Sequence, residues 1–150
     1  MIIRKYVDND FKKVAKLFYE TVHTVNAKDY TAQQLNAWAG SADSLKARRE
    51  VLLKQYTLIA EICGEIVGFG SIDKSGCLDF LFVHKDFQRR GIATALCNEL
   101  EKGFAVIKTF ASITAKPFFE SRGYIVVKAQ EVERFGVKLK NYEMEKTTAT

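Results

Sequence analysis

The 150-residue sequence is poor in the residues that build metal sites and disulfide frameworks. It has only two histidines, and its three cysteines, Cys63, Cys77 and Cys97, are widely spaced and odd in number. These cysteines fit neither a disulfide framework nor a zinc site, so we expect no metal and a reducing, cytoplasmic environment. The sequence also lacks a bilayer-length apolar run and an N-terminal signal-peptide pattern, so we expect no membrane partner.

The sequence shows no linker, since it has one proline, nine glycines and no low-complexity tract or repeat. Its length favours a single domain over residues 1–150, and its hydrophobic content of 47% is enough for a core. The net charge of +5 suggests nucleic-acid binding, but the basic residues are scattered and no nucleic-acid-binding motif is present. We therefore expect no nucleic-acid partner, and an anionic small molecule suits the positive excess as well.

Hydrophobic periodicity predicts an alternation of strands and helices. Apolar residues recur every three or four positions from Phe11 to Val22, which indicates an amphipathic helix. Gly68 and Gly70 interrupt one predicted strand and indicate a close backbone approach there. The predicted strands cover residues 2–7, 57–62, 66–72, 78–83, 109–113, 124–128 and 137–144, and the predicted helices cover 11–22, 31–38, 44–53, 92–102 and 117–123. The polar tail, residues 145–150, is expected to fray.

The strongest local signal lies at a predicted strand-to-helix turn and reads Gln88-Arg89-Arg90-Gly91-Ile92-Ala93-Thr94. The free N–H groups at a helix N-terminus carry the positive end of the helix dipole and bind anions. The two arginines add directional donors for phosphate oxygens, and Gly91 allows a bulky anion to approach the backbone. The run is neither a Walker A loop nor a dinucleotide fingerprint, and it predicts a phosphate or diphosphate ligand.

This run resembles the Q/R-x-x-G-x-G/A signature of the GNAT superfamily of acyl-coenzyme A-dependent N-acyltransferases. The preceding Leu81-Phe82-Val83-His84 resembles the end of a strand in that family, and AKPFFESRGY at 115–124 resembles its A-x-x-F-Y-x-x-x-G-F segment. Residues 112–115, together with the helical stretch after the first strand, resemble a bacterial YafP-like subgroup. Three motifs in the family's order, across most of the chain, make this resemblance specific.

The resemblance implies an α/β (α+β) fold with a mixed, mostly antiparallel central sheet of about six to seven strands flanked by helices. It also implies a V-shaped splay between the strand that ends at Val83 and the strand at 109–113. A splayed edge exposes backbone groups, to which the pantetheine of acetyl-CoA would add as an extra strand. The cofactor-binding residues that the resemblance implies are Leu81, Phe82, Val83, Gln88, Arg89, Arg90, Gly91, Ile92, Ala93, Thr94, Ser112 and Phe118.

The implied reaction moves an acetyl group directly from acetyl-CoA to a primary amine of a small molecule or peptide. A backbone N–H from the strand ending at Val83 would polarise the thioester carbonyl. A lysine-like amine has a pKa of ~10.4, so its deprotonation costs about 4.6 kcal/mol at pH 7. Protonation of the leaving thiol matters by only about 2 kcal/mol. A general base should therefore count for more than a general acid.

Asp79 is the first candidate for this base, because a period of two predicts that it shares a strand face with Leu81 and Val83. A solvated or salt-bridged carboxylate is an equally good interpretation of Asp79. Tyr30 and Glu61 are weaker candidates for the base.

Ser112 stands where many relatives have an asparagine that contacts the cofactor, and it could place a hydroxyl near the sulfur. Phe119 departs from the family pattern, because many relatives have a tyrosine general acid at this position. Cys77 is a poor candidate nucleophile, since no paired histidine is evident.

The acceptor pocket in this family is shaped by the helical stretch after the first strand, which here contains His23, Tyr30, Gln34 and Trp38. We expect His23, Tyr30 and Trp38 to line it, although Trp38 is equally well explained as a core aromatic residue. The sequence does not define the acceptor, and it leaves a homodimer open. A non-catalytic acyl-CoA-binding or regulatory module remains the alternative function, because Phe119 cannot donate a proton.

Overall fold

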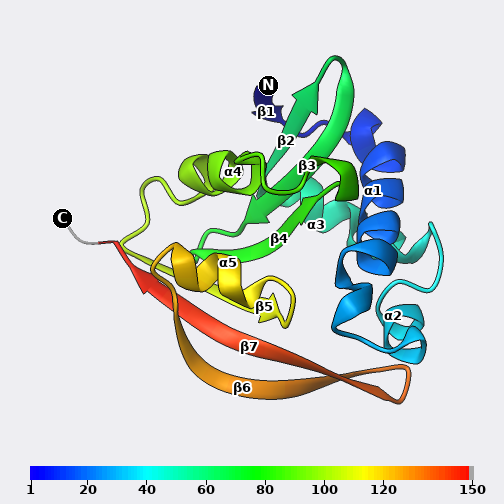
Figure 1. Cartoon of the computed structure of the whole chain (residues 1–150). Coiled ribbons are helices and arrows are strands. Elements are labelled where there is room, and N and C mark those ends of the chain that lie inside the picture. Colours follow the sequence, from blue (N-terminus) through cyan, green and yellow to red (C-terminus); the bar gives the residue numbers. More distant parts are fainter. Residues whose placement is uncertain (149–150) are drawn as a thin grey trace.

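The computed structural model describes residues 1–148, which form one seven-stranded sheet (Figure 1). The strand order is β1-β2-β3-β4-β5-β7-β6, and among the described residues β4 and β5 are the one parallel pair of neighbours. The predicted mixed, mostly antiparallel sheet is therefore confirmed. The strands are β1 (Ile2–Lys5), β2 (Tyr56–Ile62), β3 (Glu65–Ile72), β4 (Cys77–Val83), β5 (Val106–Ser112), β6 (Ile125–Arg134) and β7 (Val137–Thr147).

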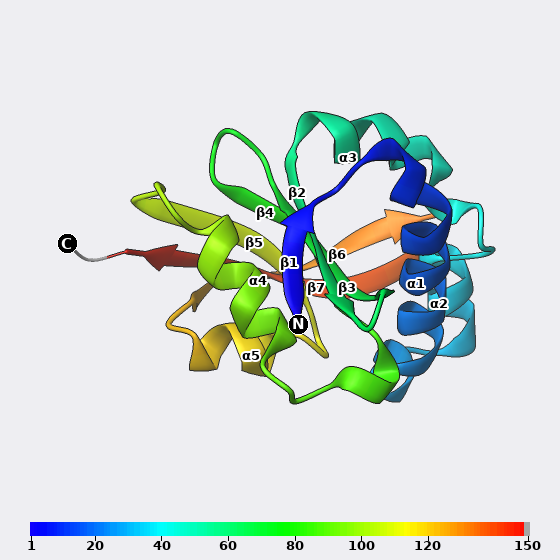
Figure 2. The ribbon, with the colours of Figure 1, turned by 90° about the horizontal axis from the view of Figure 1, so that it is seen from above.

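Helices cover the two faces of the sheet unequally (Figure 1 and Figure 2). The first face, here called the α1 face, carries α1 (Phe11–Thr24), α2 (Ala32–Trp38) and α3 (Arg49–Lys54). The opposite face, the α4 face, carries α4 (Ile92–Leu100) and α5 (Lys116–Ser121). Short 3-10 turns join these elements: η1 (Asp8–Asp10), η2 (Asn26–Lys28), η3 (Ser44–Arg48) and η4 (Lys85–Phe87).

The helices predicted over residues 11–22 and 31–38 are present as α1 and α2. The apolar positions of α1 are buried at spacings of three and four, and Val14 and Val22 are fully buried. Thr31 caps α2 by accepting a hydrogen bond from the Gln34 N–H (3.1 Å), while the Gln34 side chain accepts one from the Thr31 N–H (2.8 Å). This reciprocal pair is a capping box, which fixes where α2 begins.

Gly68 and Gly70 allow α4 to pack closely against β3. A Cβ at Gly68 would lie 3.1 Å from the Ile92 side chain, and one at Gly70 would lie 2.9 Å from the Leu100 side chain. The predicted close approach is confirmed, and it holds α4 against the middle of the sheet.

The predicted splay is also confirmed. β4 and β5 pair only where Cys77 faces Lys108 and Leu78 faces Thr109, and beyond Leu78 the two strands diverge. Along the same stretch β4 stays paired with β3 as far as Val83. One edge of β4 is therefore open over its C-terminal half.

Two predictions near the C-terminus were wrong. Residues 145–147 do not fray: they belong to β7, where Thr147 pairs with Val106 of β5. β6 runs to Arg134 instead of ending at residue 128, because β7 pairs with it along its whole length. The exposed edge strand β6 has few buried apolar residues, so hydrophobic periodicity could not show its length. Residues 149–150 of the predicted tail lie outside the described residues.

Candidate active site

A cavity of about 950 Å³ opens where β4 and β5 diverge, and residues from both faces of the sheet line it. On the α4 face its walls come from the loop before α4, the first turn of α4, and α5. On the α1 face they come from α1, α2, η3 and the β6–β7 hairpin. The cavity thus joins the two faces at the one place where the sheet is open.

Of the predicted cofactor-binding residues, all but Arg90 line this cavity. Gly91 precedes α4 with a φ of 79°, in the left-handed region that favours glycine, and a Cβ there would meet nothing within 4 Å. The Ala95 N–H donates to the Gly91 carbonyl (2.9 Å) as the first bond of the helix. The N–H groups of the preceding turn therefore have no i−4 partner, and no side chain caps them. This is the geometry of an anion site.

The two arginines of the loop differ in position. Arg89 lines the cavity and adopts a φ of 61°, which is uncommon for a residue other than glycine. Arg90 does not line the cavity, and its guanidinium lies 5.0 Å from the centre of the Phe87 ring. Gln88 braces the loop by donating from Nε2 to the Val83 carbonyl (2.6 Å). Arg89 is therefore the loop arginine that is placed to meet an anion.

The open edge of β4 presents backbone groups to the cavity. The His84 N–H donates to the Val67 carbonyl of β3 (2.8 Å), which fixes the alternation along the antiparallel pair. By the same alternation Phe82 faces β3, whereas the N–H and C=O groups of Leu81 and the N–H of Val83 face the open edge; the Val83 carbonyl also faces this edge but already accepts from Gln88. These groups are suited to pair with the amides of an extended ligand.

Asp79 lies in a β-bulge, which overturns the argument for its strand face. Ser71 pairs with Phe80 and Ile72 pairs with Leu78, so Asp79 is the extra residue on β4. Because the bulge adds one residue to β4, the side chains before and after it no longer follow a single alternation between the two faces of the sheet. As a result Leu81 and Val83 pack on the α4 face, whereas Asp79 turns to partners from η3 and the end of α3. The prediction that the three residues share one face was therefore wrong.

The Asp79 carboxylate nonetheless lines the cavity, in an ion pair with Arg48 of η3. Its Oδ2 accepts from the Arg48 guanidinium and from Gln55 Nε2 (3.0 Å). The Arg48 guanidinium also lies 5.0 Å from the centre of the Phe80 ring. Within residues 1–148 no group donates to Oδ1.

Tyr30 lines the cavity, but its hydroxyl already donates one hydrogen bond and accepts another within the protein. The hydroxyl donates to the Lys140 carbonyl (2.7 Å) and accepts from the Ile113 N–H (2.9 Å). Burial raises the pKa of Tyr30, so the phenol stays protonated near neutral pH. Tyr30 therefore fixes the ends of β5 and β7 where they border the cavity.

Ser112 lies at the end of β5, on the cavity wall. Its Oγ accepts from the Ala115 N–H (3.0 Å) and from Asn26 Nδ2 (3.4 Å), and no residue in 1–148 accepts its hydroxyl proton. Phe119 is only 2% exposed and packs edge-on against the Tyr124 ring, so its side chain belongs to the core of the α4 face. Ser112 is thus a hydroxyl that can donate into the cavity.

Other predicted candidates lie away from the cavity. His23, expected in the acceptor pocket, does not line it: its Nε2 lies 2.6 Å from the Ala39 carbonyl oxygen and its ring packs on Tyr19. Glu61 forms an ion pair with Arg4 (2.7 Å) and is not a lining residue.

Trp38 does line the cavity, where its ring meets the edges of Tyr30 and Phe82. Gln34 instead donates from Nε2 to the Lys138 carbonyl (2.9 Å) and ties α2 to the β6–β7 hairpin.

Cys77 is absent from the cavity wall, and burial raises the pKa of its thiol to about 11. This supports its rejection as a nucleophile.

The sequence interpretation missed the lining residues that come from α1, η2, η3 and the β6–β7 hairpin. For β6, the period of two could have placed Gln130, Val132 and Arg134 on one face of the strand. This strand was predicted to end at residue 128, before these three residues. The missed polar and charged residues are Thr21, Asn26, Ser44, Arg48, Gln130, Arg134, Lys140 and Asn141.

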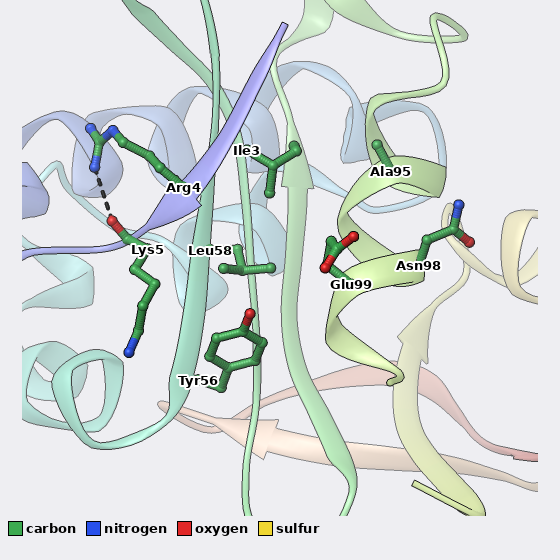
Figure 3. A pocket seen from close by; sticks show the side chains of 8 residues that line it. All are labelled: Ile3, Arg4, Lys5, Tyr56, Leu58, Ala95, Asn98 and Glu99. Atoms are coloured by element: carbon green, nitrogen blue, oxygen red, sulfur yellow. Dashed lines mark hydrogen bonds between the residues drawn. The ribbon is translucent and has the colours of Figure 1, made fainter. Parts of the chain in front are cut away.

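A second cavity of about 600 Å³ lies between β1, β2 and α4 (Figure 3). Two of its three charged lining residues are in ion pairs: Arg4 pairs with Asp10 and Glu61, and Glu99 pairs with Lys102. The third, Lys5, has its Nζ 6.0 Å from the centre of the Tyr56 ring. In the described part of the chain, no three metal-binding side chains are grouped as a metal site would require. None of the helices in this part has the length and apolar character needed to cross a membrane.

A parallel strand pair that diverges beside the positive end of a helix, with a cavity through the gap, is the arrangement expected of a GNAT acyltransferase. Residues 26–146 match the family model of the acetyltransferase (GNAT) domain, and the chain belongs to this family. The protein is thus an acetyltransferase of the GNAT type, with acetyl-CoA as its acyl donor, as the sequence predicted.

Relatives place the chain more closely within this family. It is 38% identical over 142 residues to the uncharacterized N-acetyltransferase YafP of Escherichia coli, and the match covers 95% of this chain and 93% of YafP. A crystal structure of a GCN5-related N-acetyltransferase (aminotransferase, class-II) from Rhodopseudomonas palustris has a TM-score of 0.93 and 34% identity, covering 98% of this chain and 95% of the other. YncA from Salmonella typhimurium, solved with acetyl-CoA, shares the fold at 20% identity, with a TM-score of 0.65 and coverage of 98% and 93%.

Proposed function

We propose that this protein acetylates a primary amine of a small molecule or peptide, at the point where the cavity passes between β4 and β5. One observation carries the proposal: a single cavity joins the N-terminus of α4 on one face of the sheet to Asp79 on the other. Acetyl-CoA supplies the acetyl group, which passes directly to the amine nitrogen as the coenzyme A thiol leaves.

On the donor side, backbone groups would do most of the binding. The N–H groups of the first turn of α4 and the guanidinium of Arg89 would hold the diphosphate. The outward-facing N–H and C=O of Leu81 and the N–H of Val83 would pair with the pantetheine amides, and one N–H at this edge would polarise the thioester carbonyl. These contacts need few particular side chains, which fits the apolar character of β4.

On the acceptor side, Asp79 would take the proton from the ammonium form of the amine. Arg48 and Gln55 bind Oδ2 and hold the carboxylate in place, while Oδ1 remains available for the proton. The Ser112 hydroxyl would donate to the leaving thiolate. Tyr30 would act as a positioning residue, because its hydroxyl already binds both neighbouring strands.

Release of free thiol from acetyl-CoA over a panel of primary amines tests this proposal. Removal of a general base typically lowers turnover by about 100-fold or more, so Asp79→Asn should lose turnover to that extent. Its affinity for acetyl-CoA, measured by calorimetry, should stay within about twofold of wild type. Asp43→Asn is the matched control, since Asp43 is exposed and does not line the cavity. Full turnover in Asp79→Asn across the pH range would exclude it as the base.

The alternative is a non-catalytic module that binds acyl-CoA, and it is favoured by the phenylalanine at position 119 and by the fully engaged Tyr30 hydroxyl. Tight binding of acetyl-CoA without thiol release on any amine would support this alternative. A cytoplasmic location is also proposed, supported by the three free cysteines and the bacterial relatives.

A further inference from the structure

Three polar residues form a row across neighbouring strands on the floor of the cavity. Ser112 of β5 pairs directly with Asn141 of β7, and Asn141 pairs directly with Gln130 of β6. Residues paired across strands project to the same face of a sheet, and all three line the cavity. The row therefore extends from the end of β5, next to the splay, across to the edge strand.

The two carboxamides of this row, those of Asn141 and Gln130, have no hydrogen-bond partners within residues 1–148. Asn141 Oδ1 is fully buried and lacks a hydrogen-bond partner among the described residues. Thr21 Oγ1, on the facing wall from α1, is buried and unpartnered in the same way. Buried polar atoms are normally hydrogen-bonded, and unpaired ones beside a cavity are expected to gain a partner from a ligand or a water. The Tyr30 hydroxyl donates to the carbonyl of Lys140, the residue before Asn141, and so ties the backbone of β7 beside the row.

Arg134 lies further along β6, on the same face as Gln130. Gln130, Val132 and Arg134 follow each other with the period of two, and all three line the cavity. Arg134 donates only to the backbone carbonyl of Glu133 (3.1 Å), and no carboxylate within residues 1–148 lies within 4.0 Å of it.

Asp79 is the one acidic residue among the described lining residues, and it is already paired with Arg48. The acceptor side of the cavity therefore has an excess of positive charge. A polycationic acceptor, such as a polyamine, would meet no free carboxylate beyond the proposed base.

We propose that the acceptor is a primary amine that also carries a carboxylate, with Arg134 binding the carboxylate and Asn141 and Gln130 binding the polar groups next to the amine. This inference rests on the proposed function and adds the substrate class. Arginine is suited to this role because its planar guanidinium binds a carboxylate through two parallel hydrogen bonds. A neutral carboxamide row beside it can accept from N–H groups and donate to carbonyl oxygens.

Matched pairs of acceptors test the proposal: ω-amino acids of increasing length, each compared with its terminal amide, and diamines of similar length. For at least one length, wild type should prefer the acid over the amide by about tenfold in kcat/KM. Arg134→Gln should reduce this preference to within about twofold, and Arg134→Lys should restore part of it. Comparing the acid-to-amide ratio between variants at one pH cancels the differing basicities of the amines.

Lys138→Gln is the matched control, because it removes a cation from the same hairpin but Lys138 does not line the cavity. It should leave the preference for acids unchanged. Asn141→Leu has nearly the same volume and should raise KM for acid and amide alike, by about tenfold, without changing their ratio. Affinity for acetyl-CoA should be unaffected in all these variants.

Binding provides a readout that does not depend on turnover. Trp38 is the single tryptophan of the chain and lines the cavity, so its fluorescence should report acceptor binding to the acetyl-CoA complex. Tighter binding of the acid than of the amide, lost in Arg134→Gln, supports the proposal even if no thiol is released. Equal binding of acid and amide, or a preference for diamines, overturns it, whereas absence of thiol release with every amine overturns only the proposed function.

Discussion

The two halves of the cavity are built in different ways. The donor half comes mainly from one stretch of chain, β4 followed by the loop and the first turn of α4, and its polar groups are largely backbone. The acceptor half is assembled from α1, α2, η3 and the β6–β7 hairpin, and its polar groups are side chains. Backbone groups can bind the same ligand even when the side chains of a sequence change. Side-chain contacts, in contrast, can differ between enzymes that act on different substrates. The difference suggests that the donor half defines the family and the acceptor half defines the individual enzyme.

A buried charge cluster lies at the C-terminal end of α4, the helix whose first turn borders the donor half, and its removal should have the largest effect. Glu101, at the end of α4, is 7% exposed and accepts from Arg122 (2.7 Å), from the Tyr124 hydroxyl (2.7 Å) and from Lys146 (3.1 Å). Glu101→Gln leaves buried cations without their anion, so the free energy of unfolding at pH 7 should fall by about 3 kcal/mol. Urea unfolding measures this loss, and an unchanged midpoint would contradict the assignment.

The same cluster predicts a pH dependence. Burial alone would raise the pKa of Glu101, but the hydrogen bonds from Arg122, Tyr124 and Lys146 outweigh it and the net pKa lies below its ordinary value. A carboxyl whose pKa is lowered by folding stabilises the fold above its unfolded pKa, and this contribution disappears as the pH falls through the folded pKa. Wild type and Glu101→Gln should therefore differ most near neutral pH and converge in acid, which unfolding curves at several pH values would show.

Gly91→Asp tests whether backbone groups dominate the donor half. An aspartate tolerates the left-handed φ of this position better than most residues, and its Cβ has open space, so the fold should survive. Its carboxylate would repel the diphosphate and weaken acetyl-CoA binding about 100-fold, or about 2.7 kcal/mol. Calorimetry should show a much smaller loss, below about threefold, for Arg90→Ala, because Arg90 does not line the cavity. Equal losses of acetyl-CoA affinity in Gly91→Asp and Arg90→Ala would contradict the view that the donor half binds mainly through backbone groups.

Tyr30→Phe tests the side-chain character of the acceptor half. The change removes two hydrogen bonds, to the Lys140 carbonyl and from the Ile113 N–H, and should cost about 1–3 kcal/mol of stability. We expect a higher KM for the acceptor, with kcat lowered less than about tenfold and acetyl-CoA affinity retained. A fall in kcat of about 100-fold at unchanged KM would instead identify Tyr30 as a proton donor or acceptor.

His23→Ala should have the smallest effect. It removes the contact with the Ala39 carbonyl, which is worth about 1 kcal/mol of stability, but His23 does not line the cavity. Kinetic constants for both substrates should stay within about twofold of wild type. A large change in acceptor KM would show that the cavity extends further toward α1 than its lining residues indicate.

The fold and the donor half could largely be predicted from the sequence because their signals are local. The loop around Gly91, the apolar run of β4 and the capping box at Thr31 each lie within a few consecutive residues. The resemblance to the GNAT family then supplied the mixed, mostly antiparallel sheet and the splay.

The acceptor half could not be predicted in the same way. Arg48 meets Asp79 across 31 positions of sequence, and Asn26 meets Ser112 across 86. The bulge at Asp79 adds one residue to β4, which no period-of-two argument can foresee, and it turns the carboxylate to the other face. Gln130 and Arg134 lie on an exposed edge strand, where burial leaves no hydrophobic pattern to read.

The position of β7 between β5 and β6 has a consequence for how the chain acquires its structure during synthesis. β5 leaves the ribosome with one edge largely parted from β4, and its other edge has no neighbour until β7 has followed β6 out of the exit tunnel. The emerging polypeptide therefore carries an unpaired strand for longer than a simple meander would, and unpaired strands promote self-association. Chaperone dependence of the nascent protein should accordingly be greatest after β5 is made and end when β7 appears.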